Sequence, residues 1–372
     1  MRKKKIIFLN NHFQYSDGTV RALIGVVNNL DPHKFDITVK SLYRCDYKLK
    51  QELRDDIKLE KCFGFYFRGF SKIAKLIPHK ILYNKFIGGK YDIEVAFQCD
   101  LPTILIGNSY NKNAVHIAWM HGYQLYPKEY KKCDKVVCVS KYCADKVKKA
   151  LGNTVDVTYK YNILNDEEIL NLSKEKVNLK IFQENFPIFI TVGRLSPEKG
   201  YVRLVNIMSD LKNMGYKFHL IIIGNGPEYE QIESKIKELN MEDFITMTGE
   251  TKNPHKYTKK SDVFICSSFS EGYSTACTEA AILGVPIITT NVPGGEEIIN
   301  DCKCGALTGL DDNSLKESIK KVLDNPKIIM KWKKIMSKSC NKFKSTIRKE
   351  NMNNLFNEIY NISNYKIQER RY

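Results

Sequence analysis

The sequence lacks any run of about 18 uninterrupted apolar residues, which a membrane-spanning helix would require. Its start, MRKKKIIFLNNHF, has a basic head but fewer apolar residues than the roughly 7 to 15 of a signal-peptide core. Only 11 prolines occur among 372 residues, and 43% of the residues are hydrophobic, so collagen-like and disordered chains are excluded. We therefore expect a folded protein of the cytoplasm.

Cysteines at redox or metal-binding spacing are also lacking. The 11 cysteines include no C-x-x-C pair, and the two that are nearest in sequence, Cys302 and Cys304, have no His or Cys partners at zinc spacing. An odd number of scattered cysteines fits a reducing compartment better than a framework of disulfides. We expect no metal site.

The length of 372 residues exceeds what one hydrophobic core supports, because single cores stop growing near roughly 250 to 300 residues. Apolar, β-branched runs alternate with helical segments in two sets, which is typical of parallel sheets covered by helices. The first set lies at 4–12, 35–43, 93–98, 115–121 and 135–140, and the second at 186–195, 217–227, 243–249, 262–268 and 286–290. We predict two Rossmann-like α/β domains, at 1–165 and 166–345, followed by a helical tail at 346–372 that packs back toward the first domain.

The positive charge is concentrated in the first domain. Residues 1–165 carry a net charge of +14 and residues 166–372 a net charge of +3, of a total of +17. The first domain is therefore expected to meet an anionic partner, which could be nucleic acid, a phosphorylated small molecule or an acidic membrane surface. Composition alone leaves these three possibilities open.

Loops that follow the carboxyl ends of parallel strands are where such sheets bind ligands. In TVGRLSPEKG, a predicted strand runs into Gly193, and Arg194 and Lys199 follow on either side of Pro197. Two cations in one loop can hold a diphosphate, Arg by its planar fork and Lys as a compact charge. The alternative is that both are solvated surface residues.

The turn at Gly224, Asn225 and Gly226 has part of a dinucleotide-binding fingerprint. The third glycine of G-x-G-x-x-G would fall at Tyr229, so a nicotinamide site is not supported. The two glycines still allow the backbone to approach a ligand closely. A tight turn between strand and helix explains them equally well.

The most informative stretch is SSFSEGYSTACTEAAILGVPIIT, at 267–289. A loop through Glu271, followed by a helix from Ser274, would place Glu271 and Glu279 toward the amino end of that helix. The helix terminus and its preceding backbone amides offer donors for hydroxyls or phosphates. An ordinary surface helix would not explain the small residues that crowd its first turn.

Together these motifs resemble the retaining glycosyltransferases of family 4, of the bacterial capsule or exopolysaccharide type, which have the two-domain GT-B fold. The family signature is E-x7-E within S-x-x-E-G-[FY]-[GS]-x-x-x-x-E-A. It is present here as Ser268, Glu271-Gly272-Tyr273-Ser274 and Glu279-Ala280. The similarity extends to VGRLSPEKG, IIIGNGPE and PGGEEII and covers residues 186–300.

The resemblance implies roles for residues of the second domain. Arg194 and Lys199 would hold the donor diphosphate and compensate the charge that develops on the leaving nucleotide. Glu279 would bind the ribose hydroxyls, and Glu271 would lie beside the transferred sugar. The remaining implied donor-binding positions there are Gly193, Asn225, Gly226, Gly272, Tyr273 and Ser274.

Two positions of the first domain also match. His121, in HIAWMHG, corresponds to the family's histidine near the donor sugar and joins the implied catalytic set. Gly18 corresponds to the second glycine of a Gly-Gly loop near the phosphates. Asp17 replaces the first glycine, so the role of that loop is in doubt.

The activity implied by the resemblance is transfer of a hexose or N-acetylhexosamine from a nucleotide sugar, with a UDP-sugar favoured. The acceptor would be a lipid-linked saccharide in surface polysaccharide biosynthesis. No Asp-x-Asp occurs at a predicted strand end, so we expect no divalent cation, and no cofactor is implied.

Residues 62–90 contain six Lys or Arg and seven aromatic residues but no Asp or Glu. Cations interleaved with aromatic and aliphatic residues are typical of segments that lie on a membrane surface. A buried helix with a solvated basic face is the alternative. The charge of the whole first domain favours a peripheral contact with the anionic inner face of the cell membrane.

Other function classes remain as alternatives. A nucleic-acid-binding protein would fit the basic composition, but no RRM, KH or zinc-finger pattern is present, so we expect no nucleic-acid partner. Another GT-B enzyme, such as a nucleotide-sugar epimerase or a glucan synthase-like polymerase, is a nearer alternative than a nucleic-acid-binding protein. Transfer of labelled sugar to lipid, rather than release of free epimerised sugar, would distinguish these enzymes.

Overall fold

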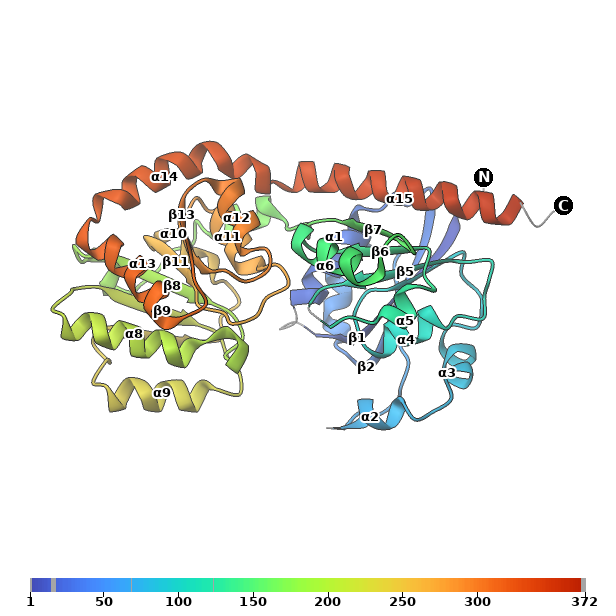
Figure 1. Cartoon of the computed structure of the whole chain (residues 1–372), viewed down its shortest axis with the longest axis horizontal. Coiled ribbons are helices and arrows are strands. Elements are labelled where there is room, and N and C mark those ends of the chain that lie inside the picture. The colour runs from blue at the N-terminus through green and yellow to red at the C-terminus, as the bar shows by residue number, and fades with distance from the viewer. Residues whose placement is uncertain (1, 15–17, 68, 123, 369–372) are drawn as a thin grey trace. The chain divides into compact units, whose positions relative to one another are not determined.

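The computed structural model describes residues 2–14, 18–67, 69–122 and 124–368 (Figure 1). The chain forms two compact units. Unit 1 comprises Met1–Leu164 and Thr346–Tyr372, and unit 2 comprises Asn165–Ser345. Each unit is built on one parallel β-sheet with helices in the connections, as the sequence predicted.

Within the described residues, unit 1 has a seven-stranded sheet in the order β3-β2-β1-β4-β5-β6-β7. The strands are β1 Lys4–Phe13, β2 Phe35–Cys45, β3 Lys58–Lys61, β4 Ile93–Ala96, β5 Val115–Met120, β6 Lys135–Cys138 and β7 Asp156–Tyr159. In β1, four consecutive apolar residues from Ile6 to Leu9 are fully buried, as expected of a parallel strand covered on both faces. The edge strand β3 was not predicted, because its sequence KLEK has no apolar run.

The helices of unit 1 fill the connections between its strands. They are α1 Gly18–Asn29, η1 Tyr47–Glu52, α2 Phe70–Ala74, α3 His79–Phe86, α4 Leu101–Gly107, α5 Pro127–Tyr130 and α6 Lys141–Leu151. The apolar residues of α1 recur at helical spacing, and Val20, Leu23 and Val27 are buried against the sheet.

Unit 2 has a six-stranded sheet in the order β10-β9-β8-β11-β12-β13, counted over its described residues. The strands are β8 Ile188–Val192, β9 His219–Ile223, β10 Ile245–Gly249, β11 Val263–Cys266, β12 Ile287–Thr290 and β13 Gly305–Thr308. The helices are α7 Asp166–Leu172, η2 Lys180–Gln183, η3 Pro197–Lys199, α8 Tyr201–Asn213, α9 Tyr229–Glu238, α10 His255–Lys260, α11 Thr275–Ile282, α12 Gly295–Cys302, α13 Asp312–Asp324, α14 Lys327–Ser339 and η4 Cys340–Phe343. The strand β13 was missed, because GALT is too short to stand out as a β-branched run.

In each sheet there is a switch point, where the chain turns from extending one side of the sheet to extending the other. The switch point of unit 1 lies between β1 and β4, and that of unit 2 lies between β8 and β11. The loops that leave the carboxyl ends of these strands diverge and form a crevice, which is where open α/β sheets bind ligands. The fold therefore directs attention to the residues that follow β1, β4, β8 and β11.

The helices that follow β13 do not form one continuous stretch. Helix α14 ends at Ser339, η4 follows, and a last helix, α15 Ser345–Gln368, belongs to unit 1 from Thr346 onward. The Phe356 ring of α15 lies 6.0 Å from the ring of Phe8 and 6.3 Å from that of Trp119, measured between centroids. The C-terminal helix, red in Figure 1, thus packs on the N-terminal domain as predicted. Every helix in the described residues is too short or too polar to cross a bilayer.

Candidate functional site

The switch point of unit 2 brings together two of the predicted catalytic residues, Lys199 and Glu271. Lys199 ends the short turn η3, and Gly200 follows it in the left-handed conformation, with φ at 67°. Glu271 lies in the loop between β11 and α11. The Lys199 Nζ donates to Glu271 Oε1 at 2.6 Å, and the two side chains are only 25% and 11% exposed.

Further hydrogen bonds hold these two loops against each other. The Ser268 hydroxyl donates to Glu271 Oε1 at 2.8 Å, and the Ser267 hydroxyl donates to the Lys199 carbonyl at 2.9 Å. The Phe269 amide donates to the Glu198 carbonyl at 2.8 Å. The ammonium and the carboxylate are therefore fixed in place before any ligand binds, which is the preorganisation that electrostatic catalysis requires.

The ionic state of Lys199 is set by two opposing effects. Burial lowers the pKa of the ammonium, but the adjacent Glu271 carboxylate attracts the proton and hydrogen-bonds to it, and the net result is a raised pKa. Lys199 therefore stays charged at neutral pH although it is largely buried. A compact cation in a partly desolvated crevice is suited to a phosphate group.

The other predicted cation, Arg194, is exposed to solvent in the loop after β8. The same loop packs against the turn after β9, where the Leu195 amide donates to the Asn225 carbonyl at 2.9 Å. A Cβ atom at Gly224 would lie 1.9 Å from the Gly193 carbonyl oxygen, so this contact admits only glycine. Asn225 itself is exposed beside it. Gly226 is constrained similarly, since its Cβ would lie 2.3 Å from the Leu195 oxygen.

Helix α11 begins beside Glu271, as predicted. The Ser274 hydroxyl caps it by accepting a hydrogen bond from the Cys277 amide at 3.2 Å, and Gly272 and Tyr273 lead into the cap. Glu279 lies in the second turn, and its Oε2 is 3.9 Å from Nδ1 of His255 on α10. The loop residues therefore line the amino end of α11, and Glu279 is placed in a separate pair with His255.

The switch point of unit 1 has a different composition. The Asn11 backbone amide donates to Gln98 Oε1 at 2.7 Å, and the Asn11 side-chain amide donates to the Cys99 carbonyl at 2.9 Å. Three side-chain atoms there, Asn10 Oδ1, Asn11 Oδ1 and His121 Nε2, are buried and have no hydrogen-bond partner among the described residues. Buried polar atoms are almost always satisfied, so this cluster marks a place where a ligand or water supplies the missing partners.

His121 follows β5, and its ring centroid lies 4.6 Å from that of Phe97. Burial lowers the pKa of its imidazole to about 3, so the side chain is neutral at physiological pH. It can exchange hydrogen bonds with a hydroxyl but cannot supply a positive charge. Gly18 begins α1 and is exposed, whereas Asp17 lies outside the described residues.

Several residues of these two clusters were not singled out from the sequence. Asn10 and Asn11 are polar residues that follow the apolar run inside β1, and Gln98 lies two residues after β4. A polar residue directly after an apolar run is the signal that could have identified them. His255 carries no such signal, because its proximity to Glu279 depends on how α10 packs. In the described parts of the chain, no group of three or more His, Cys, Asp or Glu side chains is placed to hold a metal ion.

Comparison with known proteins identifies the second unit. Residues 173–343 match the sequence profile of the family described as "Glycosyl transferases group 1". A Campylobacter jejuni protein named N-acetylgalactosamine-N,N'-diacetylbacillosaminyl-diphospho-undecaprenol 4-alpha-N-acetylgalactosaminyltransferase is 29% identical over 175 residues, 46% of each chain. The lipopolysaccharide core biosynthesis glycosyltransferase LpsD of Rhizobium meliloti is 22% identical over 85% of this chain and 87% of that one.

Several of the curated relatives are matched over only a third to about half of their length. Among solved structures, Anabaena Alr3699/HepE in complex with UDP superposes with a TM-score of 0.73 and 16% identity, covering 95% of this chain and all of that one. The fold is therefore GT-B. The profile match falls within unit 2, and it and the named relatives support a glycosyltransferase enzyme.

Proposed function

We propose that the chain is a retaining glycosyltransferase that moves a hexose or N-acetylhexosamine from a nucleotide sugar to a lipid-linked saccharide. The observation that carries this proposal is the fixed Lys199–Glu271 pair at the switch point of unit 2. A sugar phosphate bond breaks as negative charge develops on the departing nucleoside diphosphate, and Lys199 is a charged group already held where such a diphosphate would lie. Arg194, five residues earlier and exposed, would add a second cation on the same loop.

We propose the remaining donor contacts within the same crevice. The amino end of α11, with Gly272, Tyr273 and Ser274, offers donors to sugar hydroxyls or phosphates. Glu271 would accept hydrogen bonds from the transferred sugar, and Glu279 would hold the ribose. In the reaction, the anomeric carbon loses its bond to the diphosphate and gains one to the acceptor oxygen on the same face. The acceptor proton passes to the leaving phosphate oxygen.

The donor is proposed to be a UDP-sugar, and no metal or cofactor is invoked. The Anabaena protein of the same fold was solved in complex with UDP, which supports this base. A thermal-shift series with UDP, GDP and ADP tests it, because a ligand at about 100 times its dissociation constant stabilises a protein by roughly 2.7 kcal/mol. Stabilisation by GDP or ADP but not by UDP would contradict the choice of base while leaving the transfer reaction intact.

The acceptor is proposed to be a saccharide on a polyprenyl diphosphate, used for a surface polysaccharide such as a capsule or exopolysaccharide. The Campylobacter jejuni relative is named for an acceptor of this chemistry. The buried amide oxygens of Asn10 and Asn11 at the switch point of unit 1 suit the neutral hydroxyl and acetamido groups of a sugar.

Such an acceptor requires the enzyme to reach a membrane, and residues 62–90 offer a surface for it. This segment forms two short helices, α2 and α3, and five of its apolar side chains are between 48% and 82% exposed: Phe65, Phe67, Ile73, Leu76 and Ile81. Exposed lysines lie among them, at Lys72, Lys80 and Lys85. We propose that these apolar groups enter the interface of an anionic bilayer while the lysines bind its headgroups, on the inner face of the cell membrane.

The transfer reaction is tested directly with radiolabelled UDP-sugars and undecaprenyl diphosphate-linked saccharides. The proposal predicts that label moves to the organic phase and that UDP is released. Free epimerised sugar without label in the lipid would identify an epimerase, and a growing polymer in the aqueous phase would identify a glucan synthase-like enzyme. Either outcome would overturn the proposed acceptor.

The membrane contact is tested separately by cosedimentation with vesicles that contain or lack anionic lipid. Replacing Lys72, Lys80 and Lys85 with Gln should release the protein from anionic vesicles, because each lysine near the surface contributes about 1 kcal/mol and the attraction is screened by salt. Lys75 is left intact because it pairs with Asp100. A matched control replaces three exposed lysines of unit 2: Lys217, Lys327 and Lys334. Equal sedimentation of both variants with anionic vesicles would contradict the proposed membrane contact.

A further inference from the structure

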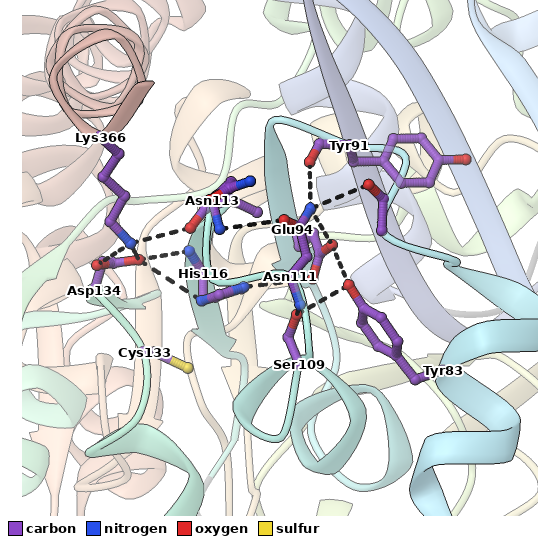
Figure 2. Close-up of polar contacts among 12 residues, drawn as sticks. Tyr83, Tyr91, Glu94, Ser109, Asn111, Asn113, His116, Cys133, Asp134 and Lys366 are labelled. Atoms are coloured by element: carbon purple, nitrogen blue, oxygen red, sulfur yellow. Dashed lines mark hydrogen bonds and ion pairs between the residues drawn. The ribbon is translucent and has the colours of Figure 1, made fainter. Parts of the chain in front are cut away.

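A second buried polar cluster in unit 1 lies at the amino ends of β4, β5 and β6, away from the switch-point loops (Figure 2). Its centre is Glu94, a carboxyl group that is completely buried. Glu94 Oε1 accepts hydrogen bonds from the Tyr83 hydroxyl of α3 at 2.7 Å and from the Asn111 side chain at 3.4 Å. The Ser109 hydroxyl donates to the Tyr83 oxygen at 3.0 Å. No residue of this cluster takes part in the proposed transfer reaction.

The second oxygen of Glu94 faces a histidine. Glu94 Oε2 lies 3.6 Å from His116 Nε2, and neither atom has a hydrogen-bond partner among the residues that the structure describes. Burial raises the pKa of Glu94 and lowers that of His116. Both shifts favour the uncharged forms, and in those forms the Glu94–His116 pair holds one proton and carries no net charge.

The pair is linked to the C-terminal helix through Asp134. The His116 backbone amide donates to Asp134 Oδ2 at 2.8 Å, and the His116 Nδ1 lies 3.9 Å from the same oxygen. Lys366 of α15 donates to Asp134 at 2.7 Å and to the Ala114 carbonyl at 3.0 Å. One carboxylate is therefore shared between an imidazole that can become charged and the lysine that holds the last turns of α15.

Other charged groups surround the cluster, and water has a route to it. A cavity of about 380 Å³ opens beside Asn111 and Lys366. The titratable or charged groups that face the pair or line this cavity are Tyr83, Tyr91, Asp134, Lys366, Arg2, Lys90 and Asp92. Arg2 and Asp92 form an ion pair at 2.7 Å and neutralise each other. The net charge next to the Glu94–His116 pair therefore depends on Asp134, Lys366 and the number of protons that the pair holds.

We propose that the Glu94–His116 pair is a proton-sensitive latch for α15, in which a second proton taken up in mild acid weakens the hold of Asp134 on Lys366. The step adds one proton from water to the imidazole and breaks no covalent bond. The resulting imidazolium is buried beside Asp134, competes for its carboxylate and repels the Lys366 ammonium. Because such coupling is reciprocal, a lysine that opposes protonation of His116 must itself be held less firmly once His116 is protonated.

Hydrogen exchange of the backbone amides in the last turns of α15, followed at pH 7.5 and pH 5.5 on the full chain, tests the latch. After correction for the intrinsic pH dependence of exchange, we expect at least about a tenfold loss of protection at the lower pH. His116→Gln should keep protection at both pH values, since it cannot take up the proton. Lys366→Met should lose protection at both.

The matched control lies on the same helix. Glu358 Oε1 contacts Lys135 Nζ at 2.9 Å, a contact that does not involve the pair, so any effect of Glu358→Gln should be the same at both pH values. In the unaltered protein, the His116 ring can also be titrated by NMR. Protonation of His116 without a parallel loss of protection in α15 would overturn the proposal, and so would an equal acid response in His116→Gln.

Discussion

The two switch points differ in charge although the sheets that form them have the same topology. In unit 2 the crevice contains the ion pair of Lys199 with Glu271, and the Glu279 carboxylate lies 3.9 Å from the His255 ring. In unit 1 it contains amides and a histidine that burial keeps neutral. The same topology thus carries an ion pair at one switch point and uncharged buried polar groups at the other.

The largest expected effect comes from removing the cation of the charged crevice. Lys199→Ala should lower turnover at least about tenfold and up to roughly a thousandfold, because it removes preorganised stabilisation of the leaving group. Steady-state kinetics with the donor sugar measure this, and circular dichroism checks the fold. Lys217→Ala, an exposed lysine of the same unit, is the control. Wild-type turnover in Lys199→Ala would remove the basis of the proposed function.

Substitutions of the two glutamates of the charged crevice should have different effects. We expect Glu271→Gln to reduce turnover at least about tenfold while changing the dissociation constant of UDP less than about threefold, because Glu271 holds Lys199 and is proposed to contact the transferred sugar. Glu279→Gln should instead weaken UDP binding by about tenfold, since it is proposed to hold the ribose. Calorimetry with UDP measures the affinity, and initial rates measure the turnover of each variant. Equal losses of UDP affinity in both variants would contradict separate roles.

A smaller effect is expected in the neutral crevice. Asn11→Ala should raise the Michaelis constant of the acceptor by roughly three- to tenfold and leave UDP affinity unchanged, because one hydrogen bond to an uncharged hydroxyl contributes about 0.5–1.5 kcal/mol. A variant that weakens UDP binding instead would show that the two units do not divide donor and acceptor in this way.

The smallest effect concerns pH. With a pKa of about 3, His121 would be protonated only as the pH falls far below the physiological range, so it should add no limb to the turnover profile between pH 5.5 and 8.5. His121→Asn should change the height of that profile and not its shape. An acid limb near pH 6.5 that disappears in His121→Asn would show that the imidazole titrates with an ordinary pKa.

The two units also differ in how much of them could be predicted. The site residues Lys199 and Glu271 could be predicted, because each lies in a short motif in which strand, loop and helix follow one another. The residues of the neutral crevice come from the carboxyl half of β1 and from the loops after β4 and β5, and the partner of Asp134 is Lys366, 232 positions away. Their proximity depends on strand order and on the docking of α15, which no local pattern encodes. The edge strand β3 was missed for the opposite reason, because its half-exposed position leaves it without an apolar signature.

Because α15 is the last helix of the chain, the N-terminal domain is completed only after the second domain has been synthesised. Unit 2 is a continuous segment, whereas unit 1 is completed by residues that are translated after it. Until Phe356 is made, the rings of Phe8, Phe35 and Trp119 lack the side chain that covers them. A nascent chain therefore carries a finished second domain while its first domain still exposes apolar surface to water. The addition of Phe356, and not the emergence of residues 1–164, completes the N-terminal core.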